Sequence, residues 1–223
     1  MKIIVAIDGF AASGKSTIAQ DLAEKTGYTH IDSGAMYRTV TLFGMQKGLV
    51  ISASDIDSKK LIELLPIINI SFDRTPDNYF TMLNGKNVEN EIRSLEVSNL
   101  TPHVAQIAAV RNFITDRLRS MGKDGGVVME GRDIGTVVFP DAKMKVFVRA
   151  PMNLSVERRL AELKQQGNPA TYQSVKDDIL ERDKIDAAWT HPAKDAIRIE
   201  NGSKPLSDIV QYLLSIFYKL TEN

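Results

Sequence analysis

The sequence predicts an α/β fold in which a parallel sheet is covered by helices on both faces. Short apolar runs rich in β-branched residues alternate with longer segments of helical spacing along most of the chain. A glycine-rich loop joins the first apolar run to the first helical segment. Because strands connected through helices run parallel and place those helices on the sheet faces, this alternation favours a doubly covered parallel sheet.

Five apolar runs are expected to form the strands of this sheet: residues 2–8, 30–31, 127–130, 145–149 and 196–200. Segments with apolar residues three and four positions apart are expected to form helices: residues 17–26, 35–47, 110–121, 154–166, 174–186 and 206–220. Strands from both ends of the chain must therefore meet in one sheet.

The segment 64–93 interrupts the alternation. Residues 67–72 and 79–83 have strand-like composition, and the pair Asn84 and Gly85 is a strong signal for a two-residue hairpin turn. We therefore expect a small β insert in an α/β core. The expected division is a core of residues 1–63 and 94–223 and an insert of residues 64–93.

Length and composition exclude several classes of protein. A chain of 223 residues can form one large domain or two small ones with a sizeable core. Its 28 basic and 28 acidic side chains give zero net charge, which argues against a general nucleic-acid or membrane surface. The absence of cysteine excludes disulfides and thiol nucleophiles. We expect a cytoplasmic monomer with neither a nucleic-acid nor a membrane partner.

The segment from Gly9 to Ser16 matches G-x-x-x-x-G-K-[ST], which binds nucleotide phosphates when a strand precedes it and a helix follows. Lys15 can reach the β- and γ-phosphates, and the Ser16 hydroxyl can ligate Mg²⁺. We therefore expect a P-loop fold that binds a nucleoside triphosphate. The expected contacts are Gly9, Phe10, Ala11, Ala12, Ser13, Gly14, Lys15, Ser16 and Thr17.

Such a loop serves GTPases, ATP-driven machines and small-molecule kinases alike. The guanine-reading N-K-x-D, the D-x-x-G switch and the transporter signature L-S-G-G-Q do not occur in this sequence. Several arginines stand out instead: Arg38, Arg111, Arg132, Arg158, Arg159 and Arg182. Transfer between two phosphorylated molecules needs cations of this kind, because they reduce repulsion and stabilise charge on the moving phosphoryl group.

Four segments carry a family resemblance: DSGAMYR at 32–38, EIR at 91–93, EGRDIGTVVFP at 130–140 and ERDKID at 181–186. In this order they closely resemble bacterial cytidylate kinase over almost the whole chain. The resemblance implies an ATP- and Mg²⁺-dependent transferase of pyrimidine nucleotide metabolism, with CMP and dCMP as acceptors. It also implies that residues from about 155 to 192 form a lid.

The resemblance also implies individual roles. Ser33 and Arg111 would meet the cytosine base, Arg38 and Arg132 the acceptor phosphate, and Asp133 the cytosine amino group. Arg182 and Asp186 would lie at the ribose, with Tyr37 beside the acceptor. Arg158 would serve ATP, and the catalytic cations would be Lys15, Arg132, Arg159 and Arg182. An aspartate fits cytosine because it accepts a hydrogen bond from N4, whereas uracil presents an acceptor there.

Other interpretations of these residues stay open. Asp133 can cap a helix or pair with Arg132, and Arg182 and Asp186 can form a surface salt bridge at helical spacing. Tyr37 can be a packing residue, and Glu130 can be a strand-end charge rather than a carboxylate that organises Mg²⁺ through water. The three histidines are expected in structural or surface roles: His30, His103 and His191.

The chain departs from the family pattern at three positions. Ser155 and Trp189 stand where the family commonly has arginines of the lid, and Pro102 stands where it has a ribose-binding serine. Trp189 is expected to continue the helical face of Arg182 and Asp186. Two other functions remain: a kinase for another nucleoside monophosphate or small metabolite, and a non-catalytic nucleotide-binding regulatory module.

Overall fold

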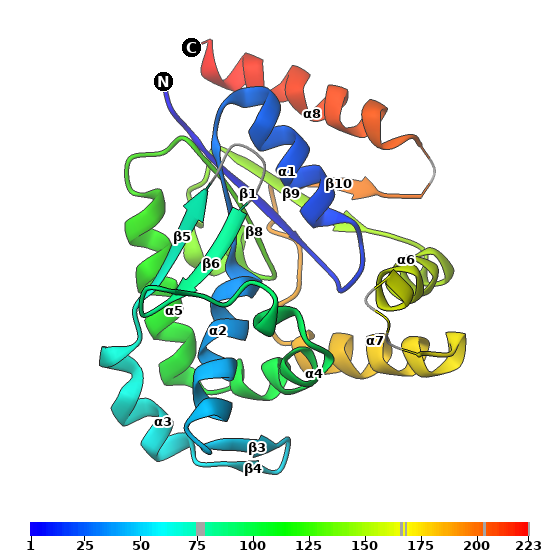
Figure 1. Cartoon of the computed structure of the whole chain (residues 1–223). Coiled ribbons are helices and arrows are strands. Elements are labelled where there is room, and N and C mark those ends of the chain that lie inside the picture. The colour runs from blue at the N-terminus through cyan, green and yellow to red at the C-terminus, as the bar shows by residue number, and fades with distance from the viewer. Residues whose placement is uncertain (75–78, 166, 168, 203, 223) are drawn as a thin grey trace. The chain divides into compact units, whose positions relative to one another are not determined.

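A computed structural model describes residues 1–74, 79–165, 167, 169–202 and 204–222 (Figure 1). The chain divides into two compact units. The first unit combines Met1–Asp32 with Met121–Asn223, and the second unit is Ser33–Ser120.

The first unit is built on a five-stranded parallel sheet in the order β10-β9-β1-β8-β2. Its strands are β1 (Ile4–Gly9), β2 (Thr29–Asp32), β8 (Val127–Gly131), β9 (Met144–Arg149) and β10 (Ile197–Glu200). β1 and β8 are buried along almost their whole length, as expected for strands in the middle of a doubly covered sheet. The predicted α/β class and its five strands are confirmed.

The α-helices that connect or cover these strands in the described part of the first unit are α1 (Lys15–Thr26), α6 (Met152–Gln165), α7 (Tyr172–Asp186) and α8 (Leu206–Thr221). Ile18 and Leu22 of α1 pack with Leu213 and Phe217 of α8 in one core cluster, which also contains Val5 and Ile7 of β1. α6 and α7 lie side by side and form a smaller apolar cluster of their own (Figure 1).

The second unit contains the elements between β2 and β8: α2 (Ser33–Gln46), β3 (Val50–Ser52), β4 (Asp55–Ile56), α3 (Ser58–Leu64), η1 (Leu65–Ile67), β5 (Ile70–Arg74), β6 (Tyr79–Leu83), β7 (Lys86–Asn87), η2 (Glu91–Arg93), α4 (Leu95–Val104) and the greater part of α5 (Ala108–Gly122). β5, β6 and β7 form the expected antiparallel sheet. Asn84 and Gly85, with φ of 49° and 81°, make the hairpin turn between β6 and β7.

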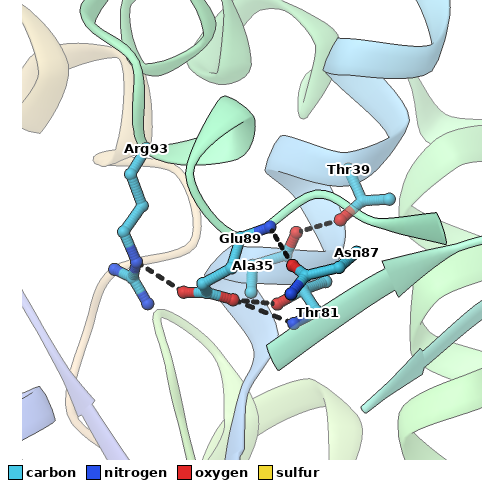
Figure 2. A network of polar contacts seen from close by, with 6 residues as sticks. All are labelled: Ala35, Thr39, Thr81, Asn87, Glu89 and Arg93. Atoms are coloured by element: carbon cyan, nitrogen blue, oxygen red, sulfur yellow. Dashed lines mark hydrogen bonds and ion pairs between the residues drawn. The ribbon is translucent and has the colours of Figure 1, made fainter. Parts of the chain in front are cut away.

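A polar network stabilises the sheet formed by β5, β6 and β7 in the second unit (Figure 2). One carboxylate oxygen of Glu89 accepts hydrogen bonds from the backbone N–H of Thr81 at 2.9 Å and from its hydroxyl at 2.7 Å. The other oxygen of Glu89 accepts from Nε of Arg93 at 2.5 Å. Glu89 therefore ties β6 to η2, which carries the EIR segment.

Candidate active site

The phosphate-binding loop connects β1 to α1, and its two glycines have no room for a side chain. A Cβ on Gly9 would lie 2.3 Å from the backbone oxygen of Val148. Gly14 has a φ of 81°, and a Cβ there would lie 2.2 Å from Nδ2 of Asn201. Ser13 Oγ is buried and has no hydrogen-bond partner within the part of the chain that the structure describes. The loop therefore offers a polar, side-chain-free cradle of the kind that suits a phosphate.

Two side chains from outside the loop hold its backbone. Asn201 Nδ2 donates to the carbonyl of Ser13 at 2.8 Å. Arg158, on α6, donates to the same carbonyl at 3.4 Å and to Oδ1 of Asn201 at 3.4 Å. Asn201 follows β10 directly, so the loop is braced from two segments far away in the sequence.

Ser16 begins a chain of hydrogen bonds that includes Glu130 on β8 and His30 on β2. Its hydroxyl donates to Oε2 of Glu130 at 2.6 Å, and Oε1 of Glu130 lies 2.9 Å from Nε2 of His30. Glu130 is almost completely buried. The hydroxyl and carboxylate are hard oxygen donors, which fit a Mg²⁺ ion shared with nucleotide phosphates. Among the described residues no group of three His, Cys, Asp or Glu could hold a metal without such help.

Charged side chains of both signs act on the ammonium group of Lys15, and all of them belong to the first unit. The pKa of Lys15 is lowered to about 8, mainly by burial and in part by the guanidinium groups of Arg132 and Arg182. The carboxylates of Glu130 and Asp32 act in the opposite direction. Three of the expected catalytic cations are therefore close enough to influence one another electrostatically.

Asp186 joins the end of α7 to the segment after β8. Its Oδ2 accepts from Nε of Arg132 at 2.9 Å, and Nε of Arg182 lies 3.9 Å from the same oxygen. The Asp186 side chain is only 10% exposed. Arg182 and Asp186 therefore do form an ion pair at helical spacing, but the carboxylate is buried and its shorter contact is to Arg132.

Asp183, one turn earlier on α7, reaches the phosphate-binding loop. Its Oδ1 accepts from the N–H of Ala11 at 3.3 Å. Burial raises the pKa of Asp183, although this hydrogen bond and the nearby Arg132 lower it in part. α7 thus contacts both the loop and the segment that carries Arg132.

The expected helical face from Arg182 to Trp189 ends early. α7 stops at Asp186, and Trp189 lies in the following turn, where its N–H donates to the carbonyl of Asp186 at 3.0 Å. The α-helical spacing that would align Trp189 with Arg182 is therefore interrupted. On α6, Arg159 pairs with Glu162 at 2.8 Å, and Ser155 is buried.

Asp133 is buried at the start of the short helix η3 (Ile134–Val138). The first N–H groups of η3, on Ile134 and Gly135, are bound by the carboxylate of Asp8 on β1, with both distances 2.7 Å. The side chain of Asp8 therefore caps η3, a role that the sequence had left open for Asp133. The apolar pattern of β1 gave no reason to single out Asp8, although a carboxylate at the end of an otherwise apolar strand is itself unusual.

The remaining expected acceptor contacts belong to the second unit. Ser33 is buried at the start of α2. The guanidinium of Arg111 lies over the ring of Tyr37, 5.7 Å from its centroid, and Nη1 of Arg111 donates to the carbonyl of Ala105 at 3.4 Å. Tyr37 and Arg38 are half-buried residues of the same helix as Ser33.

Several side chains that the sequence did not assign to the site lie against it, among them Asp8, His30, Asp183 and Asn201. Among the residues that the structure describes, no helix is both long and apolar enough to cross a membrane. The first unit thus brings together the phosphate-binding loop, Lys15, and the charged groups after β8 and on α7.

The family model described as cytidylate kinase matches residues 5–219 of this chain. The cytidylate kinase of Phocaeicola vulgatus is 43% identical over 222 residues, which cover 97% of this chain and 96% of that protein. The cytidylate kinase of Flavobacterium johnsoniae is 44% identical over 210 residues, which cover 90% of each chain.

Solved structures share the fold at lower sequence identity. Shikimate kinase from Bacteroides thetaiotaomicron superposes with a TM-score of 0.52 at 13% identity, covering 97% of this chain and 99% of that chain. An uncharacterized protein from Eubacterium ventriosum gives a TM-score of 0.54 at 13% identity, covering 96% and 98% of the two chains. These similarities support the α/β fold with a covered parallel sheet.

Proposed function

Because the chain belongs to the cytidylate kinase family, we propose that it transfers the γ-phosphoryl group of ATP to CMP, and to dCMP, giving ADP and CDP or dCDP. The observation that carries this proposal is the grouping of Lys15, Arg132 and Arg182 beside a glycine-rich phosphate cradle. Two highly charged phosphates must approach one another in this reaction, and the cations make that approach possible.

ATP would be held by residues 9–17 and Arg158. The loop supplies backbone N–H groups, Lys15 an ammonium for the β- and γ-phosphates, and Ser16 a hydroxyl that fits Mg²⁺. Glu130 holds that hydroxyl at 2.6 Å and would act on the ion through water. The bound ion would neutralise charge between the β- and γ-phosphates.

In the proposed step an oxygen of the acceptor phosphate forms a bond to the γ-phosphorus. The bond from that phosphorus to the β,γ-bridging oxygen breaks, and ADP leaves. The acceptor phosphate has a second pKa near 6, so it is ionised at neutral pH and needs no general base. Lys15, Arg132, Arg159 and Arg182 would stabilise the charge that spreads over the transferred group.

Each unit carries some of the residues proposed to contact the acceptor. Arg132, Asp133, Arg182 and Asp186 belong to the first unit, and Ser33, Tyr37, Arg38 and Arg111 belong to the second. We propose that residues 64–93 enlarge the acceptor side, and that residues 155–192 close as a lid that excludes water as a competing acceptor. All the proposed contacts come from one chain, which is compatible with a monomer.

The test is a coupled ADP-release assay with CMP, dCMP, UMP, AMP and dTMP at saturating MgATP. We expect kcat/KM for CMP and dCMP to exceed the values for the other three acceptors. Turnover only with AMP or with a non-nucleotide acceptor would indicate a different kinase. Binding of ATP without turnover on any acceptor would indicate a regulatory nucleotide-binding protein.

A further inference from the structure

Asp8 is a buried carboxylate that the proposed reaction does not use. It is the last side chain of β1 before Gly9 opens the phosphate-binding loop, and it is 4% exposed. Its Oδ1 accepts from the N–H of Ile134 and its Oδ2 accepts from the N–H of Gly135, each at 2.7 Å. Both oxygens are therefore committed to the backbone of one short segment.

That segment directly follows Arg132 and Asp133. β1 and β8 pair in parallel with Asp8 opposite Gly131, which fixes the chain just before these two residues. The hydrogen bonds from Ile134 and Gly135 fix it just after them. Arg132 and Asp133 thus lie between two backbone sites that Asp8 holds: one by strand pairing and the other by hydrogen bonds to its side chain.

The packing around these hydrogen bonds is tight. A Cβ on Gly135 would lie 3.4 Å from Oδ2 of Asp8 and 3.3 Å from the side chain of Lys145. Lys145 is itself held by Asp195 at 2.9 Å and by the carbonyl of Pro140. Val137 N donates to the carbonyl of Asp133 at 2.8 Å, so η3 closes on the residue next to Arg132. Little freedom remains for the segment to shift.

We propose that Asp8 is a positioning residue that sets Arg132 and Asp133 in register with the phosphate-binding loop. Because Asp8 is covalently continuous with that loop, a displacement of the loop is transmitted to the acceptor-binding segment, and the reverse also holds. This inference rests on the proposed function in one respect, namely that Asp133 reads the acceptor base and Arg132 its phosphate.

Replacing Asp8 by asparagine tests the role with almost no change in shape. The amide has one acceptor oxygen and an NH₂ group, so one of the two backbone N–H groups would face a donor. We expect Asp8→Asn to raise KM for CMP and to reduce the CMP:UMP ratio of kcat/KM by about tenfold, the scale of a buried N–H that loses its acceptor. The dissociation constant of ATP, measured by calorimetry, should change by less than about threefold, because the loop amides that bind ATP remain.

Asp141→Asn is the matched control, because Asp141 is exposed and lies in the same unit. It should leave KM, the CMP:UMP ratio and the melting temperature unchanged. A folded Asp8→Asn protein that loses kcat but keeps the parental KM and CMP:UMP ratio would overturn the proposal, because a purely structural role predicts that pattern.

Gly135→Ala serves if Asp8→Asn does not fold, because it keeps the carboxylate and adds a Cβ 3.4 Å from Oδ2 of Asp8 and 3.3 Å from the side chain of Lys145. A reduced CMP:UMP ratio supports the proposal, and an unchanged ratio overturns it. If the proposed function itself is wrong, the parent protein shows no preference for CMP, and this result is distinct from an effect of the variants. In that case the same comparison applies to whichever two acceptors the parent distinguishes most strongly.

Discussion

At the scale of single residues, Lys15 carries the clearest expectation. Its ammonium is the cation that the phosphate-binding loop itself directs to the β- and γ-phosphates. Lys15→Ala should reduce kcat by at least about a hundredfold, in line with the loss of one charged transition-state contact, and should leave the fold intact. The measurement is steady-state kinetics with CMP, together with a circular dichroism melting curve.

Lys25→Ala is a suitable control for this substitution. Lys25 lies on the same helix and pairs with Asp21 at 3.1 Å on the surface. A surface pair of this kind contributes less than about 1 kcal/mol, so the variant should keep its kcat and nearly its full stability. A near-parental kcat in Lys15→Ala would contradict the assignment of the loop.

Asp133 provides a test of base recognition. If its carboxylate accepts from the cytosine amino group, Asp133→Asn presents a donor as well and should tolerate the uracil oxygen. We expect the preference for CMP over UMP to fall by an order of magnitude or more, since buried polar contacts discriminate strongly. An unchanged CMP:UMP ratio of kcat/KM in a folded variant would exclude this role for Asp133.

The sequence indicated Lys15 because a short pattern with known spacing contains it. Asp8, His30 and Asn201 belong to no such pattern, because their partners lie 126, 100 and 188 positions away. Contacts over these separations follow from the strand order of the sheet. His30 was expected in a structural or surface role, and it contacts Glu130, which accepts a hydrogen bond from Ser16.

At the scale of elements, the sheet and the long helices were predicted correctly, because their hydrophobic periodicity is sustained. α3 and α4 were missed for local reasons. α3 has only seven residues. Its N-cap is Asp57, whose side chain accepts a hydrogen bond from the backbone N–H of Lys60 at 3.0 Å. α4 contains Pro102 in its last turn, and a proline usually argues against a helix. In α4 the proline is buried, and packing outweighs the lost backbone hydrogen bond.

The brace between β10 and the phosphate-binding loop also acts at this scale. Asn201→Ala removes the hydrogen bond to the carbonyl of Ser13 and leaves Arg158 with weaker partners. We expect the dissociation constant of ATP to rise about fivefold, which corresponds to one lost hydrogen bond of ordinary strength. Isothermal titration calorimetry with ATP measures this change.

Asn153→Ala is the matched control for the brace, because Asn153 is exposed on α6. It should bind ATP as the parent does. If Asn201→Ala also binds ATP with parental affinity while melting at the parental temperature, the loop keeps its shape without the brace.

At the scale of the whole molecule, the sequence correctly predicted which segments alternate, and the family resemblance was confirmed over almost the full length. The network around Asp8 could not be predicted in the same way. It requires the parallel register of β1 with β8, the turn at η3 and the approach of Lys145 from β9 at the same time. Such a site depends on tertiary packing, which the sequence pattern of a single segment does not predict.

This network makes stability depend on pH. The pKa of Asp8 is raised to about 6, mainly by burial and in part by the charge of Asp133, against the lowering effect of the two backbone hydrogen bonds and of Lys15. The folded protein therefore binds this proton more tightly than the unfolded chain does. The contribution of Asp8 to the free energy of unfolding is fully present below about pH 4 and is lost as the pH rises through about 6.

Urea denaturation of the parent and of Asp8→Asn at pH values from 4 to 7 measures this contribution, because carboxylates that do not interact with Asp8 titrate alike in both proteins and cancel in the difference. The free energy of unfolding of the parent minus that of Asp8→Asn should fall by about 2–3 kcal/mol as the pH rises over this range. A difference that is constant or rises would mean that burial does not dominate the titration of Asp8. The expected fall implies that burying the ionised carboxylate of Asp8 lowers the stability of the folded protein at neutral pH. In return, both oxygens of that carboxylate bind the segment after Asp133. Such an exchange of stability for function is typical of functional sites.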